Sequence, residues 1–203
     1  MDKLKQCLNT FTSMMGKDYY LKLEGGFVMK IFFAKKHFHH LIGLQKLKDI
    51  PPLIVNKDTN STTTIYNNIK NDRITYAQIS KSAFFSEISE RIDNFSKINN
   101  LIFEKVIINF DKNKVPSAPN YIPLIKAEYI LYKKNRNDYF HLCLGDTNNT
   151  NTIATSNTYY PETFLVQHDD YYVVGQTELK VEHINIEQPK TKSKKNTKQT
   201  KAV

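Results

Sequence analysis

The stretch YILYKKNRNDYFHLCLG, residues 129–145, places two runs of aromatic and β-branched residues on either side of a turn at Asn135-Arg136-Asn137. Short runs of this composition, bounded by turn residues, predict β-strands. Similar runs lie outward from it on both sides: VIINF (106–110), LIKAEYILY (124–132), YYPETFLVQ (159–167), YYVVGQ (171–176) and ELKVEHI (178–184). Because strand follows strand with no helical pattern between them, residues 104–187 are expected to form a mostly antiparallel sheet.

The first hundred residues show helical spacing of their apolar side chains instead. Residues 2–15 have one apolar face, and so do residues 38–47 and much of 66–102. Between the first two segments, Gly25-Gly26 separates two β-rich runs, which predicts a hairpin. The sequence therefore predicts an α+β fold, in which N-terminal helices precede the sheet.

Positive charge is concentrated at the C-terminal end of the chain. The protein has 203 residues and a formal net charge of +9, and residues 188–203 hold six lysines and no acidic residue, which leaves +3 for residues 1–187. Residues 188–203 are too polar to bury the apolar surface that would offset the entropy lost on ordering them. We therefore expect one domain over 1–187 and a disordered tail. The tail either solubilises the chain or attracts nucleic acid non-specifically. The tail lysines expected to contact nucleic acid are Lys190, Lys192, Lys194 and Lys195.

Cys7 and Cys143 are the only cysteines, and they follow no metal-ligand spacing. Two such distant cysteines indicate no disulfide framework and suit a reducing compartment. The N-terminal segment lacks the apolar core of a signal peptide, and no run is long enough to span a membrane. No Walker loop or dinucleotide fingerprint appears. The sequence therefore predicts a cytoplasmic protein with no membrane partner and no cofactor.

Three of the six histidines crowd into KKHFHHLIGL, residues 35–44. Histidine titrates near neutral pH and is the usual proton-transfer group. In a helix His40 lies one turn from both His37 and Lys36, so these three side chains share a face. Lys35 and Lys36 add positive charge that suits a phosphate. The alternative is that these histidines only line the start of a helix.

Two other kinds of chemistry remain open at this level. His37 and His40 have the i, i+3 spacing of zinc ligands, with His141 as a distant third, but no cysteine completes the set and no metal is expected. Cys143 shares one side of its predicted strand with His141, which makes it a candidate nucleophile of a cysteine hydrolase. A cysteine within a strand is more often part of the core.

FHHLIGLQKLKDI, residues 38–50, resembles the F-x-H-L-x-G-L motif of the phage-associated barnase, EndoU, colicin and RelE-like nucleases, and of their fourth subfamily in particular. The later strand runs are similar to the closing sheet of that family, so the likeness spans about residues 19–182. The resemblance implies a four-stranded antiparallel core sheet behind the helices. It also implies cleavage of RNA without metal. The expected partners are RNA, including tRNA or ribosome-associated RNA, and an inhibitor or host protein.

The same resemblance suggests which residues act. His40 matches the motif histidine and is the expected base or acid. His141 lies on a matching strand without a defined role in the family, and our hypothesis gives it the opposite role. Thr163 falls where the family has a small hydroxyl residue after a proline-containing turn. The six candidate catalytic residues are His40, His141, Lys36, Lys126, Thr163 and Gln176. The lysines are expected to stabilise phosphate charge, and Gln176 or Thr163 to position it. Further contacts to nucleic acid are expected from Lys35 and Tyr160.

The sequence thus favours a metal-independent endoribonuclease that cleaves RNA by 2′-hydroxyl attack, as a toxin or effector of a phage or mobile element. In two alternative functions the protein catalyses no reaction. One is a nucleic-acid-binding module that uses the lysine tail. The other is a factor that inhibits a host protein, which the modest +3 charge of residues 1–187 would suit.

Overall fold

A computed structural model describes residues 2–56, 60–115, 125–147 and 157–188. Its strands are β1 (Asp18–Leu23), β2 (Val28–Phe32), β3 (Val106–Asn109), β4 (Tyr129–Asn135), β5 (Asp138–Asp146), β6 (Thr158–Gln167) and β7 (Thr177–Glu187). Its α-helices are α1 (Lys3–Met14), α2 (Phe38–Leu41), α3 (Thr62–Lys70), α4 (Tyr76–Ile79), α5 (Ser89–Asn94) and α6 (Ile98–Leu101). The lysine tail and most of the predicted polar loop 146–158 lie outside the described residues.

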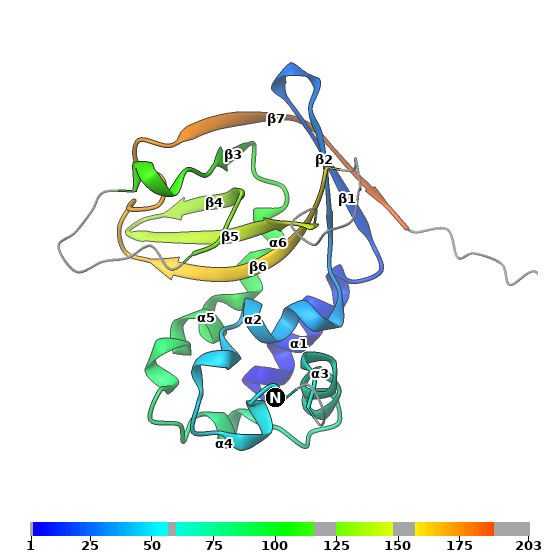
Figure 1. Ribbon diagram of the computed structural model, residues 1–203, viewed down its shortest axis with the longest axis vertical. Helices are drawn as coiled ribbons and strands as arrows, with labels where there is room; N and C mark the ends of the chain where they lie inside the picture. Colours follow the sequence, from blue (N-terminus) through cyan, green and yellow to red (C-terminus); the bar gives the residue numbers. More distant parts are fainter. Residues whose placement is uncertain (1, 57–59, 116–124, 148–156, 189–203) are drawn as a thin grey trace, which may run out of the picture.

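The strands form one closed barrel in the order β1-β2-β6-β5-β4-β3-β7, and β7 pairs with β1 to close it (Figure 1). Neighbouring strands are antiparallel except β2 and β6, which pair in parallel at Lys30–Ile31 and Thr158–Tyr159. The expected fold of helices followed by a four-stranded antiparallel core sheet is therefore wrong, because the sheet is a mixed barrel of seven strands. The β1-β2 hairpin decides this difference: it fills the gap between β6 and β7, so that no sheet edge is left unpaired.

The hairpin itself was correctly predicted. β1 and β2 pair antiparallel from Asp18–Phe32 to Lys22–Val28, and Gly25 and Gly26 turn the chain between them. Both glycines adopt positive φ, 79° and 86°, a conformation that strains any residue with a Cβ. Local sequence thus specified the hairpin, whereas its two outer partners come from the far end of the chain.

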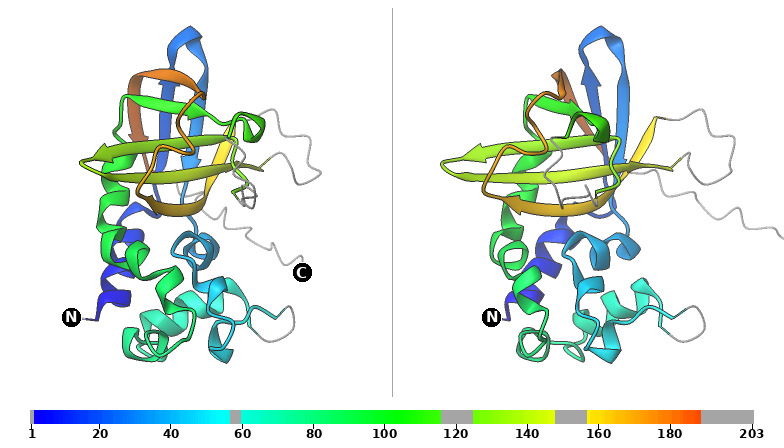
Figure 2. Two further views of the ribbon diagram at one scale, coloured as in Figure 1. Left: turned by 90° about the vertical axis from the view of Figure 1, so that its left-hand side faces the viewer. Right: turned by 60° about the vertical axis from the view of Figure 1, so that its left-hand side comes forward.

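The helices gather on one side of the barrel in all three views of Figures 1 and 2. α1 confirms the helix predicted over 2–15, and it buries Leu4, Cys7, Leu8, Phe11 and Met14. Residues 66–102 form several short helices with tight turns between them. No described helix is long and apolar enough to cross a membrane.

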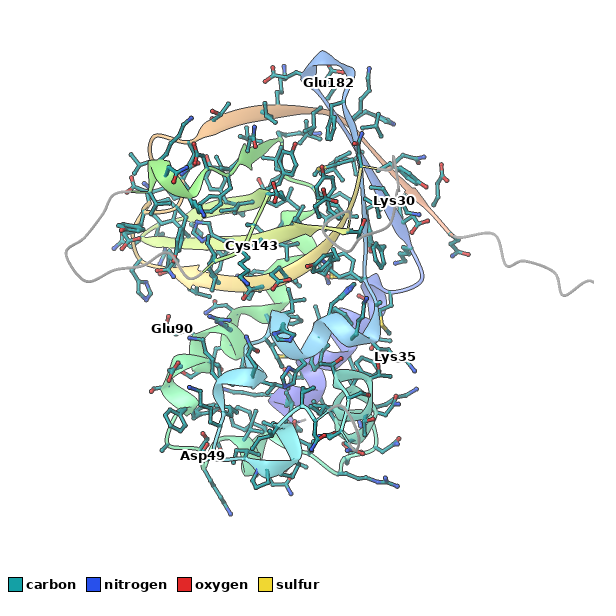
Figure 3. The ribbon with its side chains drawn as sticks, in the orientation of Figure 1. Lys30, Lys35, Asp49, Glu90, Cys143 and Glu182 are labelled. Carbon is teal, nitrogen blue, oxygen red and sulfur yellow. The ribbon has the colours of Figure 1, made fainter. Side chains whose placement is uncertain are left out.

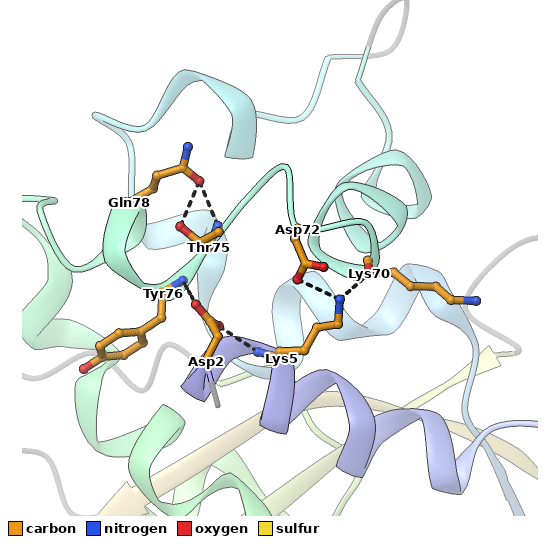
Figure 4. Close-up of polar contacts among 7 residues, drawn as sticks. All are labelled: Asp2, Lys5, Lys70, Asp72, Thr75, Tyr76 and Gln78. Carbon is orange, nitrogen blue, oxygen red and sulfur yellow. Dashed lines mark hydrogen bonds and ion pairs between the residues drawn. The ribbon is translucent and has the colours of Figure 1, made fainter.

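Polar contacts join the first helix to the chain that follows α3 (Figure 4). One carboxylate oxygen of Asp2 caps α1 by accepting from Lys5 N at 3.0 Å, and the other accepts from Tyr76 N at 2.7 Å. The Lys5 ammonium binds Asp72 at 2.7 Å and also the carbonyl oxygen of Lys70. One capping residue therefore fixes the starts of two helices, α1 and α4.

β5 separates two apolar clusters. Phe140, Leu142 and Leu144 belong to the large core, which also takes in α1 and the other helices. Cys143 points to the opposite face, where Tyr172 and other apolar side chains form a smaller cluster. Figure 3 shows Cys143 near the middle of the barrel. Because both faces are covered, residues 139–145 are buried without interruption.

The predicted strand at 171–176 is wrong, because this segment is a turn. Tyr171 N donates to the Asp169 carboxylate at 3.2 Å, and the amides of Val173 and Val174 donate to Asp170 O. Aspartates that accept from backbone amides two residues on stabilise turns. The aromatic residues of this run remain buried or half-buried, because Tyr172 packs down onto the smaller cluster.

Candidate active site

Two adjoining hollows share Ile125, Lys126 and Glu162, and so form one continuous cleft. The second hollow, about 400 Å³, lies between β6 and the helical side. Its polar lining includes His40, Lys46, Arg91, Lys126, Glu162 and Thr163. Three of the six candidate catalytic residues, namely His40, Lys126 and Thr163, thus come together from segments far apart in sequence.

Gly43, the glycine of the F-x-H-L-x-G-L motif, sets how closely α2 approaches α5. Its φ is +85°, and a Cβ there would lie 2.8 Å from Ile88 Cγ2 and 3.1 Å from Arg91 Nη1. Gly43 N donates to His40 O at 3.0 Å, so the same turn ends the helix that carries His40. The motif therefore places His40 directly and makes room for Arg91 beside it.

Arg91 reaches from α5 to β6, where its Nη1 donates to Thr163 Oγ1 at 3.1 Å. Burial lowers the pKa of Arg91, yet a guanidinium stays charged at neutral pH. A cation with little surrounding water attracts a phosphate more strongly than a solvated one. Arg91 is thus a fixed positive charge in the wall of the cleft.

A β-bulge in β6 turns Glu162 toward the same cleft. Cys143 lies opposite Thr163 and Leu144 lies opposite Pro161, so Glu162 is the extra residue. Regular alternation would send Glu162 and Thr163 to opposite faces, but both line the second hollow. The bulge therefore sets a carboxylate in a cleft that also contains a histidine and several cations.

Tyr160 lines the first hollow with a fixed ring. His37 stacks on it, with ring centroids 5.3 Å apart and an interplanar angle of 28°. His37 Nδ1 accepts from Ala34 N at 3.1 Å, and burial, with a smaller effect of Lys36, lowers the pKa of His37 to about 4. His37 is consequently neutral at pH 7 and supports the ring. The pKa of Tyr160 is raised chiefly by burial and then by the negative charge of Glu162.

His141 is not brought to the cleft. It is fully buried, and its ring lies 6.5, 6.3 and 6.0 Å from the rings of Tyr132, Tyr139 and Tyr172. Burial lowers its pKa to about 4, so it is neutral at pH 7. His141 and Cys143 share one side of β5, as predicted, but the turn at 168–176 covers that side.

Three further predicted residues lie outside the lining of the cleft. Gln176 clamps Asp111: its Oε1 accepts from Asp111 N at 2.8 Å, and its Nε2 donates to Asp111 O at 3.0 Å. Asp111 lines the first hollow, so Gln176 braces that wall. Lys35 and Lys36 are exposed, and Lys35 Nζ lies 5.6 Å from the centroid of the Tyr66 ring, at the edge of the helical side (Figure 3).

Two other kinds of chemistry were open from the sequence, a cysteine nucleophile at Cys143 and a zinc site at the histidines. Cys143 is fully buried, and burial raises the pKa of its thiol to about 12, so it is protonated at neutral pH and no nucleophile. The structure places His141 among tyrosine rings, away from the other two proposed zinc ligands. Within the described ranges, no group of three or more His, Cys, Asp or Glu side chains is arranged to hold a metal ion.

Arg91 and Glu162 are two cleft residues to which the sequence analysis gave no role. Arg91 follows Ile88 by three residues and precedes Phe95 by four, which puts a charge on an apolar helix face. A charge on an otherwise apolar helix face could have identified Arg91 as a candidate functional residue. The signal for Glu162 is Pro161, because proline within a strand often marks a bulge or an edge.

The fold and the cleft thus define a class of protein: a small mixed α and β domain with acid, base and cationic side chains gathered at one cleft. The family model of the phage-Barnase-EndoU-ColicinE5/D-RelE like nuclease 4 matches residues 3–202. The chain belongs to this nuclease family, as the F-x-H-L-x-G-L motif predicted. No curated protein and no solved structure matches the chain significantly.

Proposed function

We propose that the protein is a metal-independent endoribonuclease whose active site is the cleft between β6 and α2–α5. The observation that carries the proposal is the shared lining of one hollow by His40, Glu162, Arg91 and Lys126. RNA cleavage without metal needs a base, an acid and cations for the phosphate, and these four side chains supply all three.

In the proposed reaction the Glu162 carboxylate takes the proton of the ribose 2′-hydroxyl as O2′ attacks phosphorus. The bond from phosphorus to the 5′-oxygen breaks, and protonated His40 gives that oxygen its proton. The products are a 2′,3′-cyclic phosphate and a 5′-hydroxyl. Each proton transfer typically contributes about 10²–10⁴-fold. Glu162 replaces the buried His141 as the partner of His40.

Arg91 and Lys126 stabilise the phosphorane on which negative charge accumulates. Thr163 accepts a hydrogen bond from Arg91 and so orients the guanidinium. Preorganised cations in a site with little water are among the largest contributions to such catalysis. A toxin or effector role on a phage or mobile element remains the biological setting that we propose for this activity.

The test is incubation of purified protein with total RNA in EDTA, with His40→Ala and Glu162→Gln in parallel. We expect cleavage by the wild type, cyclic-phosphate ends, and a loss of about 10²–10⁴-fold in either variant. His183→Ala is the matched control, because His183 is exposed on β7 and lines neither hollow. Full activity of His40→Ala, or cleavage that stops in EDTA, would contradict the proposal.

A further inference from the structure

The cleft continues past His40 into an apolar notch. His40 and Gln45 line both the second hollow of the cleft and this notch. The notch is also lined by Leu47, Ile54 and Val55, which we call the apolar wall. A ligand bound at His40 can therefore extend onto the apolar wall without leaving the protein surface.

Two of the three residues of the apolar wall are exposed, and Leu47 lies buried beneath them. Ile54 and Val55 are adjacent in sequence, and they are 50% and 46% exposed. Exposing aliphatic surface to water is unfavourable, and adjacent exposed aliphatic side chains commonly mark a binding site. This surface adjoins the second hollow, which is lined by Lys46, Arg91 and Lys126 and by one carboxylate, so an occupant of both should carry an anion next to an apolar group.

The chain holds the apolar wall in place by polar contacts on both sides. His39 Nε2 donates to Leu53 O at 3.0 Å, which ties the segment to α2. The Asn60 amide donates to Pro52 O and Ile54 O, each at 2.9 Å, and Asn56 and Asn60 pair through their backbones. The apolar wall is thus preformed beside His40, which reduces the entropy lost on binding.

Building on the proposed function, we infer that the apolar wall is a subsite for one unstacked nucleobase of single-stranded RNA, next to the phosphate that is cleaved. RNA bases can leave the stack and lie on apolar side chains only where the strand is not paired. The protein should therefore prefer single strands to duplexes of the same sequence.

The experiment measures binding of a fluorescein-labelled, fully 2′-O-methylated single strand of six nucleotides to the full chain. The variants are Ile54→Ser and Val55→Ser, and the matched control is Val28→Ser, because Val28 is 44% exposed on β2 and lines none of the three hollows. We expect a Kd about 10-fold weaker for each notch variant, close to 1.4 kcal/mol, and no change in the control. The difference should persist at high salt, because an apolar contact is not screened.

Unchanged Kd values in both notch variants, with the wild type still cleaving RNA, would overturn the subsite and leave the proposed function intact. Equal cleavage of duplex and single strand would also overturn it. Failure of the wild type to bind or cleave any RNA would overturn the proposed function, and the subsite with it. If the notch variants instead lose binding of an inhibitor protein while binding the oligonucleotide normally, the apolar wall is a protein-docking surface and the inference is wrong.

Discussion

Arg91 and Thr163 are 72 residues apart in sequence, yet Arg91 Nη1 donates to Thr163 Oγ1 at 3.1 Å. This bond joins α5 to the bulged part of β6, next to Glu162. The geometry of the cleft therefore depends on how the helices dock against the barrel, and not on either element alone.

Arg91→Ala should reduce the cleavage rate by about 10²–10³-fold, because a fixed donor to the developing charge is lost. Thr163→Val should have a smaller effect, about 10-fold, because the guanidinium remains but loses its orienting hydrogen bond. Single-turnover cleavage of a short RNA measures both. Equal rates in wild type and Arg91→Ala would contradict the placement of Arg91 at the phosphate.

Gly43→Ala should destabilise the protein more than Gly25→Ala does. Both glycines have a positive φ, +85° and +79°, so each substitution carries about 1–2 kcal/mol of backbone strain. A Cβ at Gly43 would also press on Ile88 and Arg91, whereas nothing lies within 4 Å of one at Gly25. Urea unfolding gives the difference in free energy of unfolding. The cleavage rate should fall only in Gly43→Ala, and a fall in both would point to a general loss of stability.

His141→Phe should make the protein less sensitive to acid and leave cleavage within a few fold of wild type. Because burial lowers the folded pKa of His141 to about 4, its stabilising contribution is present above pH 6.5 and is lost as the pH falls toward 4. Between pH 7.5 and 5 the wild type should lose about 2 kcal/mol more than the variant, because burial also lowers the pKa values of His37 and His39 to about 4 and these two histidines act in both proteins. Urea unfolding at the two pH values measures it. A loss of cleavage above 100-fold in folded His141→Phe would restore the catalytic role predicted for this histidine.

His168 should affect the pH dependence of stability in the opposite direction to His141. Its Nδ1 lies 3.0 Å from Asp138 and its Nε2 3.2 Å from Glu90, and the hydrogen bond with Asp138, followed by that with Glu90, raises the pKa of His168. The stabilising contribution is therefore fully present below pH 6.5 and is lost as the pH rises through the higher folded pKa. His168→Gln should lower the Tm at pH 5.5 and have no effect at pH 8.5, with His183→Ala as the control. The effect should be small, because His168 is 62% exposed.

The sequence anticipated much of the local structure. The α1 helix, the hairpin at Gly25-Gly26 and the strands of residues 129–145 follow from apolar spacing and turn residues, which are properties of short segments. Tyrosine and valine favour strands, so the sequence predicts a strand over 171–176, whereas the neighbouring aspartates hold the backbone in a turn. The lysine tail lies outside the described residues, so its disorder stays a prediction.

By itself, the sequence determined the nuclease family, through the spacing of Phe38, His40 and Gly43, and with it one side of the cleft. Only the tertiary structure decided that the strands close into a barrel, that His141 is buried, and that Arg91 and Glu162 join His40. The physical reason is that local patterns depend on short segments, whereas burial depends on contacts between segments far apart in the chain. Alternation along a strand shows which side chains share a face, but which face is covered depends on segments that pack there from elsewhere in the chain.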